Sequence, residues 1–154
     1  MVKIRPKTIV QMNVSAVGET HSRSRISVRD VESVIDEPHA RDGTNLGPAP
    51  TETLMASLIG CTNVISKKIA HKMGFEMGEM NINLTANFDR RGVTLMEEVD
   101  HPFSNIVMDI EVSTNGTPDQ MADMQEDLAK FCPVAKVIRG SGISITENWT
   151  MKPL

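Results

Sequence analysis

The stretch from Pro48 to Gly74, PAPTETLMASLIGCTNVISKKIAHKMG, constrains the fold more than any other part of this chain. Apolar residues recur in it at helical spacing and form one stripe: Leu54, Leu58, Cys61, Ile65 and Ile69. Pro50 suits the first position of a helix, and Gly74 suits the position just after its end. The sequence therefore predicts one long helix with Cys61 in its apolar stripe.

Length and charge limit the class of protein. A chain of 154 residues can bury a core of its own, so we predict a single domain over residues 1–154. The net charge of −4 and the lack of a Lys/Arg run argue against a nucleic-acid partner. No apolar run is long enough to span a membrane, and MVKIRPKTIVQMN lacks the apolar region of a signal peptide. We therefore expect a cytoplasmic protein with no membrane association.

Strand patterns surround the helix on both sides. Before it, composition and alternation predict three short strands, at Thr8–Ala16, Arg23–Val28 and Glu32–Ile35. The first of these has one apolar face, made of Val10, Met12 and Val14, which we expect to be half-buried. Asp36–Ala49 is rich in Pro, Gly, Asp and Asn, so it is predicted to be a loop.

After the long helix, the same signals predict two strands, a helix, a short helix and a last strand. Their expected positions are Asn81–Phe88, Ile106–Val112, about Pro118–Phe131, Val134–Ile138 and Ile143–Met151. Alternating strands with hairpin-length links favour antiparallel pairing, with the helices on one face. The fold class that we predict is α+β.

The two cysteines, Cys61 and Cys132, are the residues best suited to chemistry. In a reducing compartment they are either inert core residues or reactive thiols. Cys132 precedes Pro133 at a predicted helix start, where free N–H groups and the helix dipole favour a thiolate. Cys61 lies in mid-helix among Leu and Ile, and it gains nothing from the dipole. The local pattern therefore favours Cys132 as the more acidic thiol.

The sequence gives little support for a metal or cofactor. The chain has four histidines, His21, His39, His71 and His101. None of them stands at a metal-ligand spacing from either cysteine. The glycine-containing run Gly43–Gly47 precedes no P-loop lysine, so it does not predict a phosphate site. We expect no metal and no cofactor.

Two motifs carry a family resemblance. GTNLGPAPTETLMASLIGCT, at Gly43–Thr62, followed by KFCPVAKVI, at Lys130–Ile138, closely resembles the OsmC/Ohr family of organic-hydroperoxide-reducing proteins. The order of elements fits that family from about Thr8 to Met151. The resemblance implies an intertwined homodimer, in which sheets of both chains wrap around two long central helices and the active sites lie at the subunit interface.

The resemblance also implies a reaction. Cys61 matches the cysteine that attacks a hydroperoxide, and Cys132 matches the resolving cysteine. The Cys61 thiolate would form a sulfenic acid, Cys132 would condense with it to a disulfide, and an external dithiol would reset the pair. Protein-bound dihydrolipoamide is the dithiol in part of the family, so a lipoylated protein is a possible partner.

The chain departs from the family pattern at one acidic position. Well-characterised members carry a glutamate where this chain has Thr51, and the nearest acid is Glu52. On a straight helix Glu52 points about half a turn away from Cys61. Glu52 has two expected roles. In the first it reaches the Cys61 site, either because the helix is kinked or because it acts in the other subunit. In the second it is a first-turn acid at the positive end of the helix dipole.

The arginine expected to stabilise the thiolate is not marked by any motif. The candidates are Arg23, Arg25, Arg29 and Arg41, and we favour Arg25. An alternative function follows from these departures and from the eleven methionines, which make apolar surfaces adaptable. It is a non-catalytic OsmC-like dimer that binds a small apolar ligand or responds to redox conditions.

Overall fold

The computed structural model describes residues 8–154, which divide into two compact units between Leu54 and Met55. The order of elements along the chain is three strands, a long helix, two strands, two helices and a strand. This order is the one that the sequence predicts, and the α+β class is confirmed.

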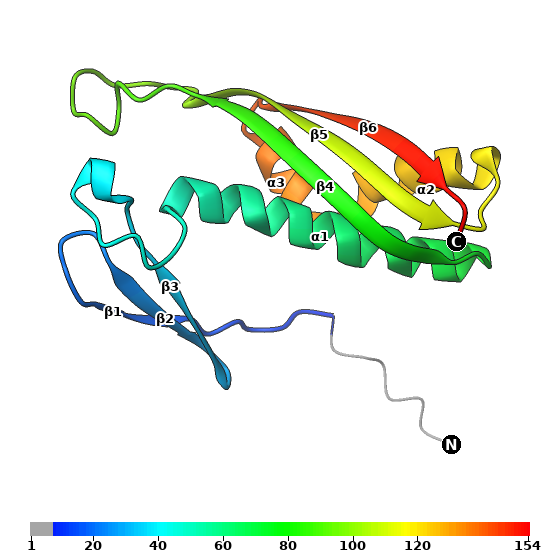
Figure 1. The fold of residues 1–154 in the computed structure, drawn as a ribbon, viewed down its shortest axis with the longest axis horizontal. Helices are drawn as coiled ribbons and strands as arrows, with labels where there is room; N and C mark the ends of the chain where they lie inside the picture. The colour runs from blue at the N-terminus through cyan, green and yellow to red at the C-terminus, as the bar shows by residue number, and fades with distance from the viewer. Residues whose placement is uncertain (1–7) are drawn as a thin grey trace. The chain divides into compact units, whose positions relative to one another are not determined.

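The N-terminal unit holds a small antiparallel meander, drawn in blue in Figure 1. Its strands lie in the order β1-β2-β3, with the bounds β1 Ser15–Gly18, β2 Ser24–Val28 and β3 Val31–Ile35. Arg29 adopts a positive φ of 56° in the tight turn between β2 and β3. Both β2 and β3 agree closely with the predicted strands.

The predicted first strand is wrong over most of its length. Residues 8–14 have no regular secondary structure, and β1 begins only at Ser15. Val10, Met12 and Val14, expected to be half-buried, are 69%, 86% and 64% exposed. Polar and apolar residues do alternate in this segment, but β2 pairs only with Ser15–Gly18. A strand needs a neighbouring strand as well as a suitable pattern.

The predicted loop between β3 and the long helix is confirmed, and it contains one turn of 3-10 helix, η1 His39–Arg41. Its two spaced glycines have a steric role. A Cβ atom at Gly43 would lie 1.8 Å from the Glu37 carbonyl oxygen, and one at Gly47 would lie 2.1 Å from that of Val34. Close approach between backbone segments therefore requires glycine at both positions.

The C-terminal unit is built on a three-stranded sheet with the order β4-β5-β6. The bounds of these strands are β4 Met77–Phe88, β5 Phe103–Thr114 and β6 Ser144–Lys152. β4 and β5 pair antiparallel as expected, but β6 runs parallel to β5. The two helices between β5 and β6 make the connection long enough for the chain to return to the start of β5, which parallel pairing requires. The expectation of purely antiparallel pairing is therefore corrected.

Three helices complete the fold: α1 Pro50–Met73, α2 Pro118–Phe131 and α3 Pro133–Gly140. α1 ends where Gly74 takes a left-handed φ of 82°. α2 begins with a capping box, because Thr117 Oγ1 accepts from the Gln120 N–H while Gln120 Oε1 accepts from the Thr117 N–H. Within residues 8–154, no helix is long and apolar enough to cross a membrane.

The core of the C-terminal unit lies between the sheet and the helices that cover one of its faces (Figure 1). The alternation predicted for β5 is confirmed, since its inward side chains are at most 1% exposed: Ile106, Met108, Ile110 and Val112. They belong to one cluster of buried apolar side chains with Leu58 of α1 and with Met121, Met124 and Leu128 of α2. Cys132 is part of the same cluster, so the core reaches one of the two thiols.

Candidate functional site

The two cysteines lie side by side in the C-terminal unit. Cys61 comes from α1 and Cys132 from the junction of α2 and α3, and 2.9 Å separates their Sγ atoms. This is longer than a disulfide bond of about 2.05 Å, and both residues are free thiols. The Cys132 thiol donates a hydrogen bond to the Cys61 sulfur. The fold therefore brings together the two residues that the sequence singled out.

The helix junction fixes the position of Cys132. This residue ends α2, where its N–H donates to the Leu128 carbonyl oxygen at 2.9 Å, and it also caps α3. Pro133 occupies the first position of α3, as predicted. The Ala135 N–H lies 3.5 Å from Cys132 Sγ and donates to it. Both helices therefore hold the thiol through backbone groups next to it.

Burial, and not the helix start, decides the acidity of Cys132. Its side chain is fully buried, and burial together with the hydrogen bond to Cys61 raises the pKa of Cys132 to about 11. The hydrogen bond from Ala135 lowers this pKa, but by less. The argument that the helix start makes Cys132 acidic is therefore wrong. Removing the thiolate from water costs more free energy than the N–H donors of the helix start recover.

Cys61 occupies the edge of the buried side of α1. The buried positions on that helix are Leu58, Thr62, Ser66, Ile69 and Ala70. Cys61 itself is partly exposed and packs against the core cluster. One thiol of the pair is thus accessible, while the other is enclosed.

Arg25 and Glu52, the other two predicted site residues, belong to the N-terminal unit. Arg25 Nε lies 2.7 Å from Glu19 Oε1, and its side chain is 44% exposed. Glu52 Oε2 accepts a hydrogen bond from the Ala49 N–H at 2.8 Å. Glu52 therefore secures the first turn of its own helix, which is one of the two roles expected for it.

The remaining candidate arginines are held in different ways. Arg23 pairs with Glu19 at 2.8 Å, and Arg41 pairs with Glu37. Arg29 is exposed in the turn between β2 and β3. Glu19 thus joins two arginines, and their hydrogen bonds, first that of Arg25 and then that of Arg23, lower the pKa of Glu19.

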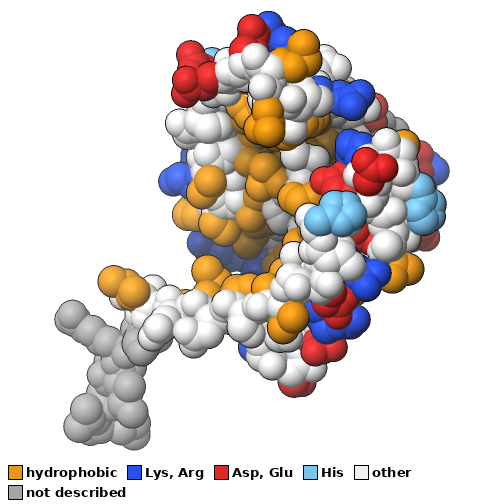
Figure 2. Space-filling model, turned by 90° about the vertical axis from the view of Figure 1, so that its left-hand side faces the viewer, with side chains coloured by type: hydrophobic (Ala, Val, Ile, Leu, Met, Phe, Trp, Pro, Cys, Tyr) orange, Lys and Arg blue, Asp and Glu red, His pale blue; other side chains and the backbone are white. Residues whose placement is uncertain are grey.

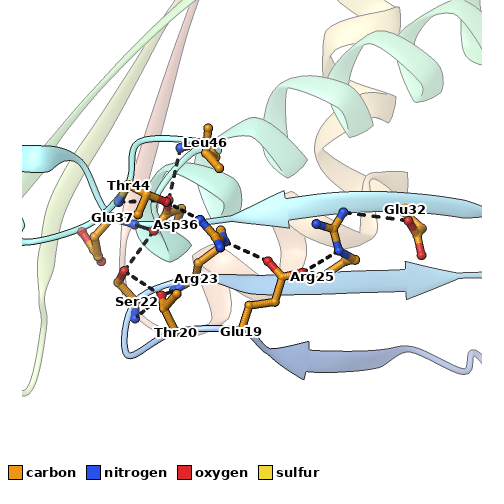
Figure 3. A network of polar contacts seen from close by, with 10 residues as sticks. All are labelled: Glu19, Thr20, Ser22, Arg23, Arg25, Glu32, Asp36, Glu37, Thr44 and Leu46. Carbon is orange, nitrogen blue, oxygen red and sulfur yellow. Dashed lines mark hydrogen bonds and ion pairs between the residues drawn. The ribbon is translucent and has the colours of Figure 1, made fainter.

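Asp36 is the centre of a polar network that the sequence did not reveal (Figure 3). This residue is fully buried, and its carboxylate accepts from Ser22 Oγ at 3.0 Å and from the Glu37 N–H at 2.8 Å. The N–H groups of Thr44 and Leu46 donate to its other oxygen at 3.2 and 3.1 Å, as does the Thr44 hydroxyl.

The network extends from Asp36 to Arg25. The Thr44 hydroxyl donates to Asp36 and accepts from Arg23 at 2.7 Å, while Glu19 joins Arg23 to Arg25 (Figure 3). A single Asp at the start of a loop carries no sign of this role in the sequence. Only the folded loop, which returns Thr44 to β3, creates it.

No group of three or more His, Cys, Asp or Glu side chains suited to a metal ion occurs within residues 8–154. Of the histidines, His39 has its Nδ1 atom 3.1 Å from the Gly43 carbonyl oxygen, so it contributes to the loop.

Comparison with protein families gives a clear assignment. A family model described as an OsmC-like protein matches residues 43–148, which include both cysteines. The chain belongs to the OsmC-like family, and the resemblance seen in the sequence is confirmed. A search of curated proteins found no match.

Solved structures agree with the fold. An OsmC-like protein from Mycoplasma pneumoniae is 17% identical, with a TM-score of 0.77 over 92% of this chain and 97% of that chain. An organic hydroperoxide resistance protein OsmC from Legionella pneumophila is 12% identical, with a TM-score of 0.67 over 94% and 99%. OhrB of Bacillus subtilis, also an organic hydroperoxide resistance protein, is 20% identical, with a TM-score of 0.59 over 92% and 98%. At these identities the likeness establishes the fold.

The different burial of the two thiols leads to a first prediction. At pH 8 iodoacetamide should alkylate Cys61 well before Cys132, because a thiol with a pKa of about 11 is only about one part in a thousand thiolate at that pH. Peptide mass mapping at successive times measures both rates. In guanidinium chloride, as a control, both cysteines should react at similar rates. Equal rates in the native protein would contradict this assignment.

A second prediction concerns Asp36. Burial opposes its charge, but the hydrogen bonds from Thr44, Leu46, Ser22 and Glu37 outweigh burial and hold the pKa of Asp36 well below its usual range. A carboxylate with a lowered pKa in the folded state stabilises the fold above its unfolded pKa, about 3.9. This contribution is lost as the pH falls toward the folded pKa.

The test compares urea unfolding of the wild type and Asp36→Asn between pH 7 and pH 2.5. The wild type should be the more stable at pH 7, and the difference should shrink below about pH 4. Asp30→Asn, in the exposed turn after β2, is the matched control and should follow the wild type. A difference that stays constant over the whole pH range would refute the role of Asp36.

Proposed function

We propose that this protein is a thiol-dependent peroxidase that reduces organic hydroperoxides. The observation that carries the proposal is the 2.9 Å separation of Cys61 Sγ and Cys132 Sγ. These are the only two cysteines in the chain, and the family match includes both. The names of the Legionella and Bacillus proteins, which refer to organic hydroperoxide resistance, support the choice of oxidant.

The proposed reaction begins at Cys61. Its thiolate attacks the terminal oxygen of the hydroperoxide, the O–O bond breaks, and the alkoxide takes up a proton and leaves as an alcohol. Cys61 is then a sulfenic acid. The Cys132 sulfur attacks the sulfenic sulfur, a disulfide forms, and the hydroxyl group leaves as water with the proton of Cys132. An external dithiol returns both thiols by exchange and becomes a disulfide itself.

The burial of the two thiols supports this order of events. Cys61 is the partly exposed member of the pair, and an approaching peroxide meets it first. Cys132 is fully buried, and its raised pKa keeps it protonated until the sulfenic acid forms beside it. The reverse order would require the enclosed thiol to meet the substrate.

The short distance between the sulfurs bears on resolution of the sulfenic acid. A disulfide needs Cα atoms within about 7 Å and side chains that point toward each other. Two Sγ atoms in hydrogen-bond contact already point toward each other. Formation of the disulfide then requires the sulfurs to approach by less than 1 Å, from 2.9 Å to about 2.05 Å.

Arg25 and Glu52 complete the proposed site. We assign to Arg25 the positive charge that stabilises the Cys61 thiolate, and we retain Glu52 as the proposed acidic residue. The polar network that runs from Asp36 through Thr44, Arg23 and Glu19 supports the choice of Arg25. Glu19 at the end of this network holds the Nε atom of Arg25, while the arginine side chain stays 44% exposed. Arg25 Nη1 also lies 4.0 Å from Oε2 of the exposed Glu32 (Figure 3).

A homodimer and an external dithiol are the proposed partners. Large apolar side chains are strongly exposed along the N-terminal segment, namely Ile9, Val10, Met12, Val14 and Val17. Figure 2 shows orange hydrophobic side chains on the segment that adjoins the grey residues. A row of this kind is typical of an interaction surface, and a second copy of the chain would cover it. A cytoplasmic location would supply the reduced dithiol, for which a lipoylated protein is our candidate.

The test of the function measures cumene hydroperoxide reduction with dihydrolipoamide as reductant. The wild type should turn over, and Cys61→Ser should fall to the rate without enzyme, because the attacking sulfur is gone. Cys132→Ser should still consume one equivalent of peroxide per chain and leave a sulfenic acid that dimedone traps. Wild-type turnover no faster than that of Cys61→Ser would favour the non-catalytic alternative.

The role of Arg25 has its own test. Arg25→Ala should lower the rate constant for oxidation of Cys61 by about a hundredfold, the scale on which loss of one charge-stabilising donor acts. Arg29→Ala removes an exposed arginine from the next turn, so it serves as the matched control and should keep the wild-type rate. Stopped-flow measurement of sulfenic acid formation separates this step from reduction by the dithiol. Equal rates for the two variants would exclude Arg25.

A further inference from the structure

A groove in the C-terminal unit lies outside the chemistry described so far. It runs between α1 and α2, with a volume of about 350 Å³, within the range of about 300–1,000 Å³ that is usual for small-molecule sites. Apolar side chains form much of its lining: Ile65, Ile69, Met73 and Phe131. Lys68, Lys72 and Asp127 supply its charged groups.

The charges of this groove are unbalanced. Asp127 Oδ1 is already paired with Lys130 Nζ at 3.1 Å. Among the described residues, Lys68 and Lys72 have neither an ion pair nor a side-chain hydrogen bond. Two positive charges therefore face the groove in a chain whose net charge is −4. An anion is the complementary ligand.

Helix geometry relates the lysines to the thiols. At 100° per residue, Lys68 and Lys72 lie within about 20° of Cys61 around the axis of α1. At 1.5 Å per residue they lie about 10 Å and about 16 Å further along that axis. On the other side of the groove, Phe131 directly precedes Cys132. The groove therefore leads from the thiol pair toward the two lysines.

An exposed aromatic residue on this face indicates a ligand with an apolar part. Phe131 is 59% exposed, although it ends a helix whose Leu128 is buried. Covering Phe131 with an apolar chain would remove much of that surface from water, which favours binding. A peptide helix about 10 Å wide does not fit a cavity of this volume, whereas a flexible hydrocarbon chain does.

We propose that the groove binds an amphiphilic carboxylic acid. Its hydrocarbon chain lies over Ile65, Ile69 and Phe131, and its carboxylate meets Lys68 and Lys72. The binding uses no oxidised thiol, so it is independent of the peroxidase reaction. Because the groove begins one helical turn from Cys61, a bound acid also restricts access to that sulfur.

Decanoate is the probe, and isothermal titration calorimetry with the reduced full-length protein measures its binding. The double variant Lys68→Gln/Lys72→Gln should bind roughly fivefold to tenfold more weakly, as two partly exposed ion pairs imply. Lys67→Gln is the matched control, because Lys67 lies about 120° around the helix from Cys61 and does not line the groove. Decanol, which lacks the charge, should bind as weakly to the wild type as decanoate does to the double variant.

A second measurement places the ligand near the thiols. Saturating decanoate should slow the alkylation of Cys61 by iodoacetamide in the wild type, and the same concentration should protect the double variant much less. Cys61→Ser should still bind decanoate with wild-type affinity, which separates this proposal from the peroxidase reaction.

Three outcomes would overturn the proposal. The first is no measurable binding of decanoate, and the second is equal binding of decanoate to the wild type and the double variant. The third is decanoate binding that weakens as the protein concentration rises, together with self-association of the protein in sedimentation. A second copy of the chain would then cover the groove.

Discussion

The contact between Cys61 and Cys132 depends on the packing of the C-terminal unit more than on either local sequence. One sulfur is carried by a long helix and the other by a junction between two helices, and 2.9 Å separates them. The buried side chains of β5 lie in one cluster with α1 and α2, and Cys132 belongs to it. Any change that shifts one of these helices by an ångström would therefore alter the separation of the thiols.

Residues with a local signal were predictable from the sequence. Pro50 and Gly74 mark the ends of α1, and the Thr117-Pro118 pair with Gln120 marks the start of α2. Cys132 before Pro133 was correctly predicted as a cap of α3. Each of these features depends on hydrogen bonds within a few residues, so the sequence pattern contains the information.

Features that depend on distant segments were not predictable in the same way. β6 pairs with β5 in parallel because two helices return the chain to the start of β5, and the alternation within β6 is compatible with either direction. Residues 8–14 alternate like a strand, but within residues 8–154 no strand pairs with them. Asp36 gathers donors from positions 22 to 46, and no single stretch of sequence shows that they converge.

The acidity of Cys132 shows how tertiary burial overrides a local electrostatic argument. A helix start offers an anion at most a few N–H donors, and here the Ala135 N–H donates to the sulfur at 3.5 Å. Full burial removes all hydration from the same atom, so the proton stays on Cys132 at neutral pH. In the reaction that we propose, a protonated, enclosed thiol beside an accessible one suits a resolving cysteine. Such a thiol would not meet the oxidant first, yet it lies within reach of its neighbour, at 2.9 Å. The division of roles that we propose for the two cysteines thus rests on their different depths in one core, a property that belongs to the folded chain and not to either motif.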